Sequence, residues 1–106
     1  MHTTISARHC EVTENLQDRA QELADRMEKL SPHALEATVV FETDVHAQRS
    51  KVEIRLHARG RKVLVGIGEG PDHRTALDRA EAKLRPQLEK ASRPRVRARR
   101  ASAKDS

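Results

Sequence analysis

Hydrophobic residues recur along the chain with two different spacings, and these predict two helices and four strands. A stripe with the three-to-four spacing of one helix face runs over residues 14–30 and consists of Leu16, Ala20, Leu23, Met27 and Leu30. A second stripe with this spacing follows residue 72 and consists of Leu77, Ala80, Leu84, Leu88 and Ala91. Residues 2–9, 35–45, 50–59 and 61–68 instead alternate or are rich in β-branched residues, which predicts strands.

The last two strands carry the clearest alternation. We expect one face of the segment 50–59 to enter the core with Val52, Ile54, Leu56 and Ala58. The same pattern in 61–68 predicts inward-facing Val63, Val65 and Ile67. Gly60 between them can take the positive φ of a tight turn, so these strands should form a hairpin. Clean alternation is typical of an antiparallel sheet with one solvated face.

Capping and breaking residues set the ends of the helices. Thr13 is a suitable N-cap for the first helix, and Val12 can pack back onto its first turn. Pro32 cannot continue that helix. Asp72 caps the second helix, in which Pro86 predicts a kink rather than an end.

The predicted order is therefore β-α-β-β-β-α. Each helix has one apolar stripe and the sheet has one apolar face, so both helices should cover that face. The fold class is α+β, a two-layer sandwich with a four-stranded sheet and two helices on one face. We expect one domain over residues 1–92 and a basic, disordered tail over 93–106.

Charge is distributed unevenly along the chain. Residues 1–48 hold nine acidic and four basic side chains, whereas residues 49–100 hold sixteen basic and six acidic ones. A basic end indicates a polyanionic partner, nucleic acid or an anionic membrane surface. Phe41 is the only aromatic residue, so unpaired bases would find no rings on which to stack.

Targeting and redox signals are few. The sequence has no apolar run long enough to span a membrane and no signal-peptide core at residues 1–10. Cys10 is the only cysteine, so no internal disulfide can form and a reducing cytoplasm is expected.

Catalytic and cofactor patterns are weak. The six histidines are scattered, without the helical i, i+4 pair that binds zinc. His9 and Cys10 would point to opposite faces of a strand, so they cannot form a nucleophile and its base, and Cys10 is expected to be a small buried hydrophobe. The stretch GIGEGPD matches the spacing of neither the dinucleotide-binding fingerprint nor the P-loop. Its glycines are expected to bend the strand into a turn. We expect no enzyme, no cofactor, no metal and no small-molecule substrate.

Basic residues on the first helix have acidic neighbours. Glu22 with Arg26 and Asp25 with Lys29 have the favourable acid-first i, i+4 order, as does Glu81 with Arg85 on the second helix. A solvated, ion-paired face is therefore the better interpretation of the first helix.

The second helix and the tail have a stronger basic signal. Arg79, Lys83 and Lys90 fall on one stripe, flanked by Arg74 and Arg85. The tail arginines have no acid near them and suit phosphate through their planar forks; they are Arg93, Arg95, Arg97, Arg99 and Arg100.

These elements carry a family resemblance. CEVTENL at the first helix, and EG with PDHRTALDRAEAKLRPQLEK at the second, resemble the ribosome hibernation-promoting factors, which include ribosome-associated inhibitor A and were once called σ54 modulation proteins. The most specific matches are Val12-Thr13 with Leu16, Glu69-Gly70 with Asp72, Ala76-Leu77-Asp78, and Lys83-Leu84 with Gln87-Leu88. Pro86 departs from the family pattern, which has an arginine there.

The resemblance implies a non-enzymatic factor that occupies the messenger and transfer RNA channel of the small ribosomal subunit and silences translation under stress. Its partners would be that subunit and its ribosomal RNA, with no membrane. The expected RNA-binding residues are Arg26, Lys29, Arg79, Lys83, Arg85, Lys90, Arg93, Arg95 and Arg97. Two alternatives stay open: a general double-stranded RNA-binding module, and a protein-interaction module with a basic tail.

Overall fold

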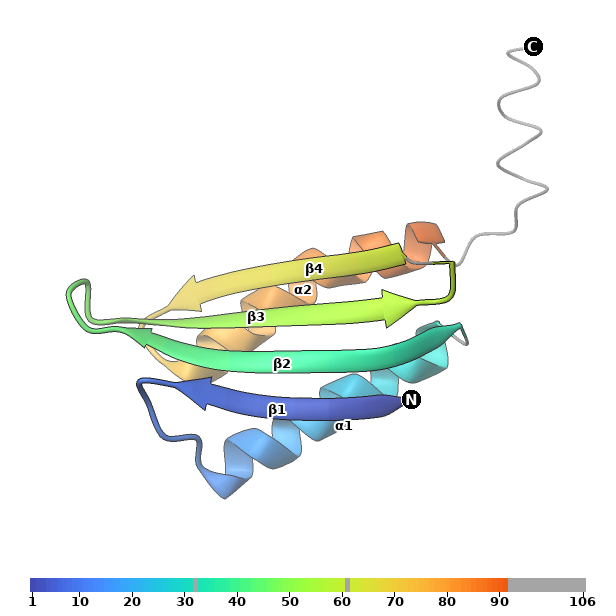
Figure 1. Ribbon diagram of the computed structural model, residues 1–106. Coiled ribbons are helices and arrows are strands. Elements are labelled where there is room, and N and C mark those ends of the chain that lie inside the picture. Colours follow the sequence, from blue (N-terminus) through green and yellow to red (C-terminus); the bar gives the residue numbers. More distant parts are fainter. Residues whose placement is uncertain (32, 61, 92–106) are drawn as a thin grey trace, which may run out of the picture.

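The computed structural model describes residues 1–31, 33–60 and 62–91 and has the predicted order of elements. The elements are β1 (His2–Arg8), α1 (Glu14–Leu30), β2 (Ala34–Asp44), β3 (Arg49–Ala58), β4 (Lys62–Gly70) and α2 (His73–Ala91) (Figure 1). The predicted ends of the elements are correct to within two residues. Pro32 and the tail 93–106 lie outside the described residues.

The four strands form one sheet in the order β1-β2-β3-β4. β2, β3 and β4 pair antiparallel, as the alternation predicted. β1 pairs parallel with β2, so the expectation of an antiparallel sheet is wrong for this strand. The reason is the connection: the chain returns from β1 to β2 through the whole length of α1, and a crossover of this kind joins parallel strands.

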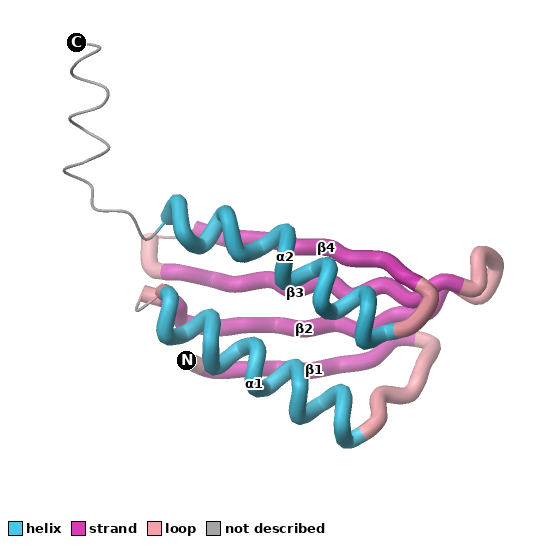
Figure 2. The backbone as a smooth tube through the Cα atoms, turned by 180° about the vertical axis from the view of Figure 1, so that it is seen from behind, coloured by secondary structure: helices cyan, strands magenta, loops and turns pink. Residues whose placement is uncertain are grey.

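Both helices cover the same face of the sheet, which confirms the two-layer sandwich (Figure 2). α1 packs over β1 and β2, and α2 packs over β3 and β4. Between the layers lies an aliphatic core that includes Phe41 and most of the two predicted helical stripes. Leu16 is half-buried beside this core, whereas Leu30 is 37% exposed, so its assignment to the core is wrong. The largest fully buried side chains of the core are Phe41, Leu23, Met27, Ile54, Leu56, Leu77, Leu84, Leu88, Val39 and Val52. The side chain of Ala91 lies outside the described part.

The capping predictions for both helices are confirmed. Thr13 accepts a hydrogen bond from the Leu16 backbone N–H to its Oγ1 at 3.2 Å. Val12 is half-buried against the core beside it. Asp72 accepts a hydrogen bond from the Thr75 N–H to its Oδ1 at 2.8 Å, and this bond holds the pKa of its carboxyl below the ordinary value. Helices thus begin where orphan N–H groups find side-chain acceptors.

The predicted inward face of β4 is wrong. Val63 and Ile67 are exposed and Val65 only half-buried, whereas Gly66, Gly68 and Gly70 are buried and face α2. A Cβ on Gly66 would lie 2.9 Å from the Leu84 Cβ, and one on Gly68 would collide with the Ala76 carbonyl. The glycines therefore let α2 lie directly on the strand backbone, rather than bending the strand into a turn as expected.

α2 continues through Pro86 to Ala91, which confirms the prediction that the proline does not end the helix. The predicted kink at this position stays a prediction. No helix of residues 1–31, 33–60 and 62–91 has the length and apolar character that crossing a bilayer requires.

His9 and Cys10 follow β1 rather than belonging to it, so the argument from opposite strand faces is wrong in its premise. His9 has a φ of 55° in the bend that leaves the strand. Cys10 is half-buried, and its Sγ donates to the Phe41 carbonyl at 3.5 Å. The thiol thus serves as a small packed side chain, though one less buried than expected.

Candidate nucleic-acid interface

Two arginines from different helices converge on one carboxylate between α1 and α2. Arg26 Nη2 lies 3.3 Å from Glu81 Oε2, and Arg85 Nη2 lies 2.9 Å from the same oxygen. The Glu81 side chain is 16% exposed, against 50% and 45% for the two arginines. Glu81 therefore occupies the position between the two guanidinium groups where an external anion would otherwise sit.

The first helix is ion-paired, but with other partners than predicted. Arg26 crosses to Glu81 of α2 instead of pairing with Glu22. Asp25 accepts from Gln21 at 3.1 Å, and among the described residues Lys29 forms no ion pair. Of the three ion pairs predicted from helical spacing, the structure forms the one between Glu81 and Arg85.

Arg19 crosses between the helices in the same way, to Asp78 at 3.0 Å. An acidic side chain on a neighbouring helix can lie as close to an arginine as one on the next turn of its own helix. The spacing of residues within one helix does not reveal such partners.

The predicted stripe of α2 lies at the open edge of β4. Arg79 Nη1 donates to the Glu69 carbonyl at 2.8 Å, and Gln87 Nε2 donates to the Val65 carbonyl at 2.8 Å. Lys83 lies between these two positions and lines a shallow surface depression with Ile67 and Glu69. Lys90, seven residues further on, shares this side of the helix.

Lys29, Lys83 and Lys90 are the freest of the expected RNA-binding residues. All three side chains are exposed, and within the part of the chain that the structure describes none forms an ion pair. The expected residues thus form two groups: Arg26 and Arg85 between the helices, and Arg79, Lys83 and Lys90 at the β4 edge. Lys29 lies apart from both, in the last turn of α1. Arg93, Arg95 and Arg97 lie outside the described residues.

Two further exposed cations lie where the sequence was interpreted only as a turn. Arg59 and Lys62 flank the β3–β4 turn, in which Gly60 has the expected positive φ, 84°. Pairing of Ala58 with Lys62 places them at one end of the sheet. The run RGRK is the signal that could have identified them, because hairpin register brings its charges together.

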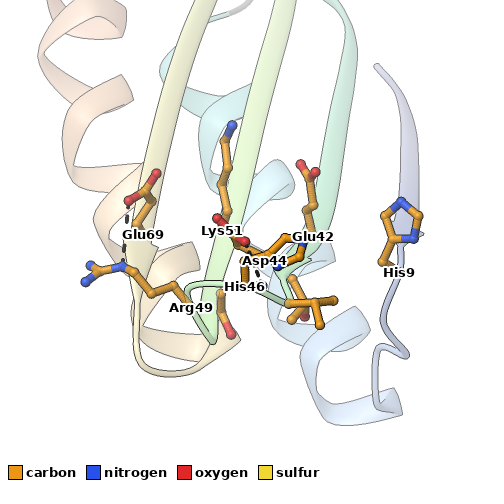
Figure 3. Close-up of a pocket in the computed structure, with 10 residues that line it drawn as sticks. His9, Glu42, Asp44, His46, Arg49, Lys51 and Glu69 are labelled. Carbon is orange, nitrogen blue, oxygen red and sulfur yellow. Dashed lines mark hydrogen bonds and ion pairs between the residues drawn. The ribbon is translucent and has the colours of Figure 1, made fainter.

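The opposite end of the sheet has a different character. A pocket of about 400 Å³ lies at the β2–β3 turn, and Figure 3 shows His9 on the far side of it from Arg49 and Glu69. Lys51 is paired across the strands with Glu42 on one side and Glu69 on the other. Arg49 lies 3.8 Å from Glu69. The cations Arg49 and Lys51 at this end of the sheet thus already have carboxylates beside them, which makes this pocket a poor site for an external anion.

Side-chain arrangements for metal binding are equally lacking in the described ranges. No group of three or more His, Cys, Asp or Glu side chains within residues 1–31, 33–60 and 62–91 could hold a metal ion. The geometry places exposed lysines without ion-pair partners among the described residues on a two-layer scaffold. Fold and surface are those of an α+β module with exposed cations on its helices.

Comparison with known proteins identifies the family. The family model described as sigma 54 modulation protein / S30EA ribosomal protein matches residues 3–95. The chain belongs to this family, whose members are ribosome-associated factors, and the expected resemblance is confirmed. No curated protein sequence matches this chain significantly.

Solved structures share the fold. The N-terminal domain of Protein Y from Thermus thermophilus is 22% identical, with a TM-score of 0.72 over 85% of this chain and 98% of that one. A ribosomal subunit interface protein from Coxiella burnetii is 17% identical, with a TM-score of 0.68 over 86% of this chain and 97% of that one. Both support the β-α-β-β-β-α sandwich.

Proposed function

We propose that this protein is a non-enzymatic factor that binds ribosomal RNA of the small ribosomal subunit, occupies the messenger and transfer RNA channel and silences translation under stress. The observation that carries the proposal is the exposure of Lys83 and Lys90 on α2 without an ion-pair partner in the described part of the chain. Family membership supports the ribosome as the partner.

The chemistry of binding follows from the side chains available. Ammonium and guanidinium groups contact phosphates, and the grooves of A-form RNA offer side chains shape and phosphate more than base identity. Phe41, the only residue of the Phe, Tyr and Trp class, is fully buried, so unpaired bases find no exposed ring of this class on which to stack. Affinity should therefore depend on preformed, folded RNA and fall with salt.

A charge-reversal pair tests the proposal. Changing Lys83→Glu together with Lys90→Glu should weaken binding to purified small subunits, measured by co-sedimentation, and leave the melting temperature nearly unchanged. The matched control is Arg8→Glu with Arg74→Glu, two exposed cations that have no ion pair among the described residues. Equal binding by both double variants would exclude the α2 lysines from the interface.

Competition separates this function from a general duplex-binding module. Excess free RNA duplex should displace the protein from small subunits poorly, because the proposed partner is the folded cleft. Efficient displacement would favour the general module instead. If the protein does not sediment with small subunits at moderate salt, the proposed function is wrong. Removing residues 93–106 should lower the salt dependence of binding without unfolding residues 1–91.

A further inference from the structure

The C-terminal ends of both helices and the β3–β4 turn meet at one end of the molecule (Figures 1 and 2). Contacts across the elements establish this. Met1 at the start of β1 pairs through its ammonium with Glu28 near the end of α1, at 2.8 Å. The Arg59 N–H donates to the His33 carbonyl at 3.0 Å, which joins the β3–β4 turn to the start of β2.

α2 reaches the same end because it runs antiparallel to β4. Thr75 lies over Gly70 at the start of the helix. Twelve residues later Gln87 contacts Val65. The final turn of α2, with Lys90, therefore lies beside the first residues of β4.

Four exposed cations are gathered at this end: Lys29, Arg59, Lys62 and Lys90. In the described part of the chain none of their side chains forms an ion pair. Three carboxylates lie at the same end: Glu28, which binds the N-terminal ammonium, Glu36 near the start of β2, and Glu89 in the last turn of α2; among the described residues none of them pairs with the four cations. Neighbouring strands lie about 4.8 Å apart, so the four-stranded end is roughly 15 Å wide and the cations are close enough to act on one ligand.

The two ends of the molecule thus differ in charge. At the other end the four carboxylates of Glu42, Asp44, Glu69 and Asp72 are accompanied by four cations, so that end is close to neutral; the cations are Arg8, Arg49, Lys51 and Arg74. The sheet is therefore polarised along its strands, with unneutralised positive charge at the β3–β4 turn. A field of this shape orients a polyanion toward one end before contact.

A purely structural role explains only part of this cluster. Lys29 and Lys90 lie in the last turns of their helices, where a cation complements the negative end of the helix dipole. Arg59 and Lys62 belong to a strand turn and have no such role. Their exposed charges are left without a structural partner among the described residues.

We infer that Arg59 and Lys62, with Lys29 and Lys90, form a phosphate-binding surface at the β3–β4 end, and that this end contacts the backbone of folded RNA. The inference rests on the proposed function and deepens it, because it adds a strand turn to an interface expected on the helices. The four side chains of the cluster are cations without an aromatic ring, which suits them to phosphate contacts more than to base stacking.

The test compares three double variants of the full chain on purified small subunits: Arg59→Glu with Lys62→Glu, Lys83→Glu with Lys90→Glu, and the control Arg8→Glu with Arg74→Glu. The turn variant should bind at least about tenfold more weakly than the control and lose about 1.5 from the log–log salt slope, since two phosphate contacts are removed. The neutral pair Arg59→Gln with Lys62→Gln should show a smaller loss in the same direction, and circular dichroism verifies folding.

Binding of the turn variant equal to the control overturns the inference, whatever the α2 variant does. A loss confined to the α2 variant leaves the proposed function intact and rejects the turn. If the unaltered protein does not bind small subunits, the proposed function is wrong. The inference is then tested separately, by binding of the same variants to an RNA duplex of about 16 base pairs. Weaker duplex binding by the turn variant than by the control supports a phosphate surface, and equal binding rejects it.

Discussion

The side-chain amide of Gln87 donates a hydrogen bond of 2.8 Å to the main-chain carbonyl of Val65. β4 is an edge strand of the sheet, and Arg79 donates to a second carbonyl of the same strand, that of Glu69. Open strand edges pair readily with other chains. The side chains of α2 therefore occupy an edge that would otherwise be available for pairing between molecules.

Replacing Gln87→Ala should cost about 0.5–1.5 kcal/mol in unfolding free energy, because one hydrogen bond is lost and a carbonyl is exposed. The variant should also self-associate more at high concentration, measured by light scattering. Glu89→Ala, an exposed neighbour, serves as the control. Unchanged stability and association would show that the edge does not need this side chain.

Replacing Glu81→Gln should raise the affinity for small subunits. Its carboxylate lies between Arg26 and Arg85, and loss of the charge frees both guanidinium groups for phosphate. Each additional phosphate contact steepens the log–log salt dependence by about 0.7–0.9, which a salt titration of binding measures.

Stability should change little in the Glu81→Gln variant, because both arginines are about half exposed and the amide oxygen of glutamine can still accept hydrogen bonds from them. Ion pairs with solvated partners contribute about 0–1 kcal/mol. Glu89→Gln removes the same charge from an exposed position elsewhere on α2 and is the matched control. An equal affinity gain in both variants would indicate a general charge effect and remove Arg26 and Arg85 from the interface.

Replacing Gly68→Ala should destabilise the fold by about 3 kcal/mol, the upper range for overpacking, since the added methyl meets the backbone of α2 at Ala76. Gly60→Ala should cost less, about 1 kcal/mol, because its space is open and only the positive φ is strained. Chemical denaturation compares the two. A smaller cost at Gly68 would contradict direct contact of helix and strand backbone.

The charged cap at Asp72 predicts a pH dependence. The Thr75 N–H bond lowers the pKa of the carboxyl in the folded state, so its ionised form stabilises the fold above the ordinary pKa of about 3.9. This stabilisation is lost as the pH falls through the lowered folded-state pKa. The melting temperature of the protein should exceed that of Asp72→Asn at neutral pH, and the difference should disappear in strong acid.

Local features of the sequence determined the elements and their caps. The stripes from Ala20 to Met27 and from Leu77 to Leu88 were correctly assigned to the core, whereas Leu30, at the end of the first stripe, is exposed. Thr13 and Asp72 cap as predicted. These features depend on spacing within one segment and on hydrogen bonds a few residues long. Such information is contained in the neighbouring residues themselves.

Only the tertiary structure decided how the segments face one another. Alternation along β4 is equally consistent with Val63 and Ile67 inward or with Gly66 and Gly68 inward, and the close approach of α2 selects the glycines. Likewise, Arg26 pairs with Glu81 of another helix rather than with Glu22. The gathering of Lys29, Arg59, Lys62 and Lys90 at one end also depends on strand order and helix direction. Distances between layers and between distant segments are set by packing of the whole chain, which no local pattern contains.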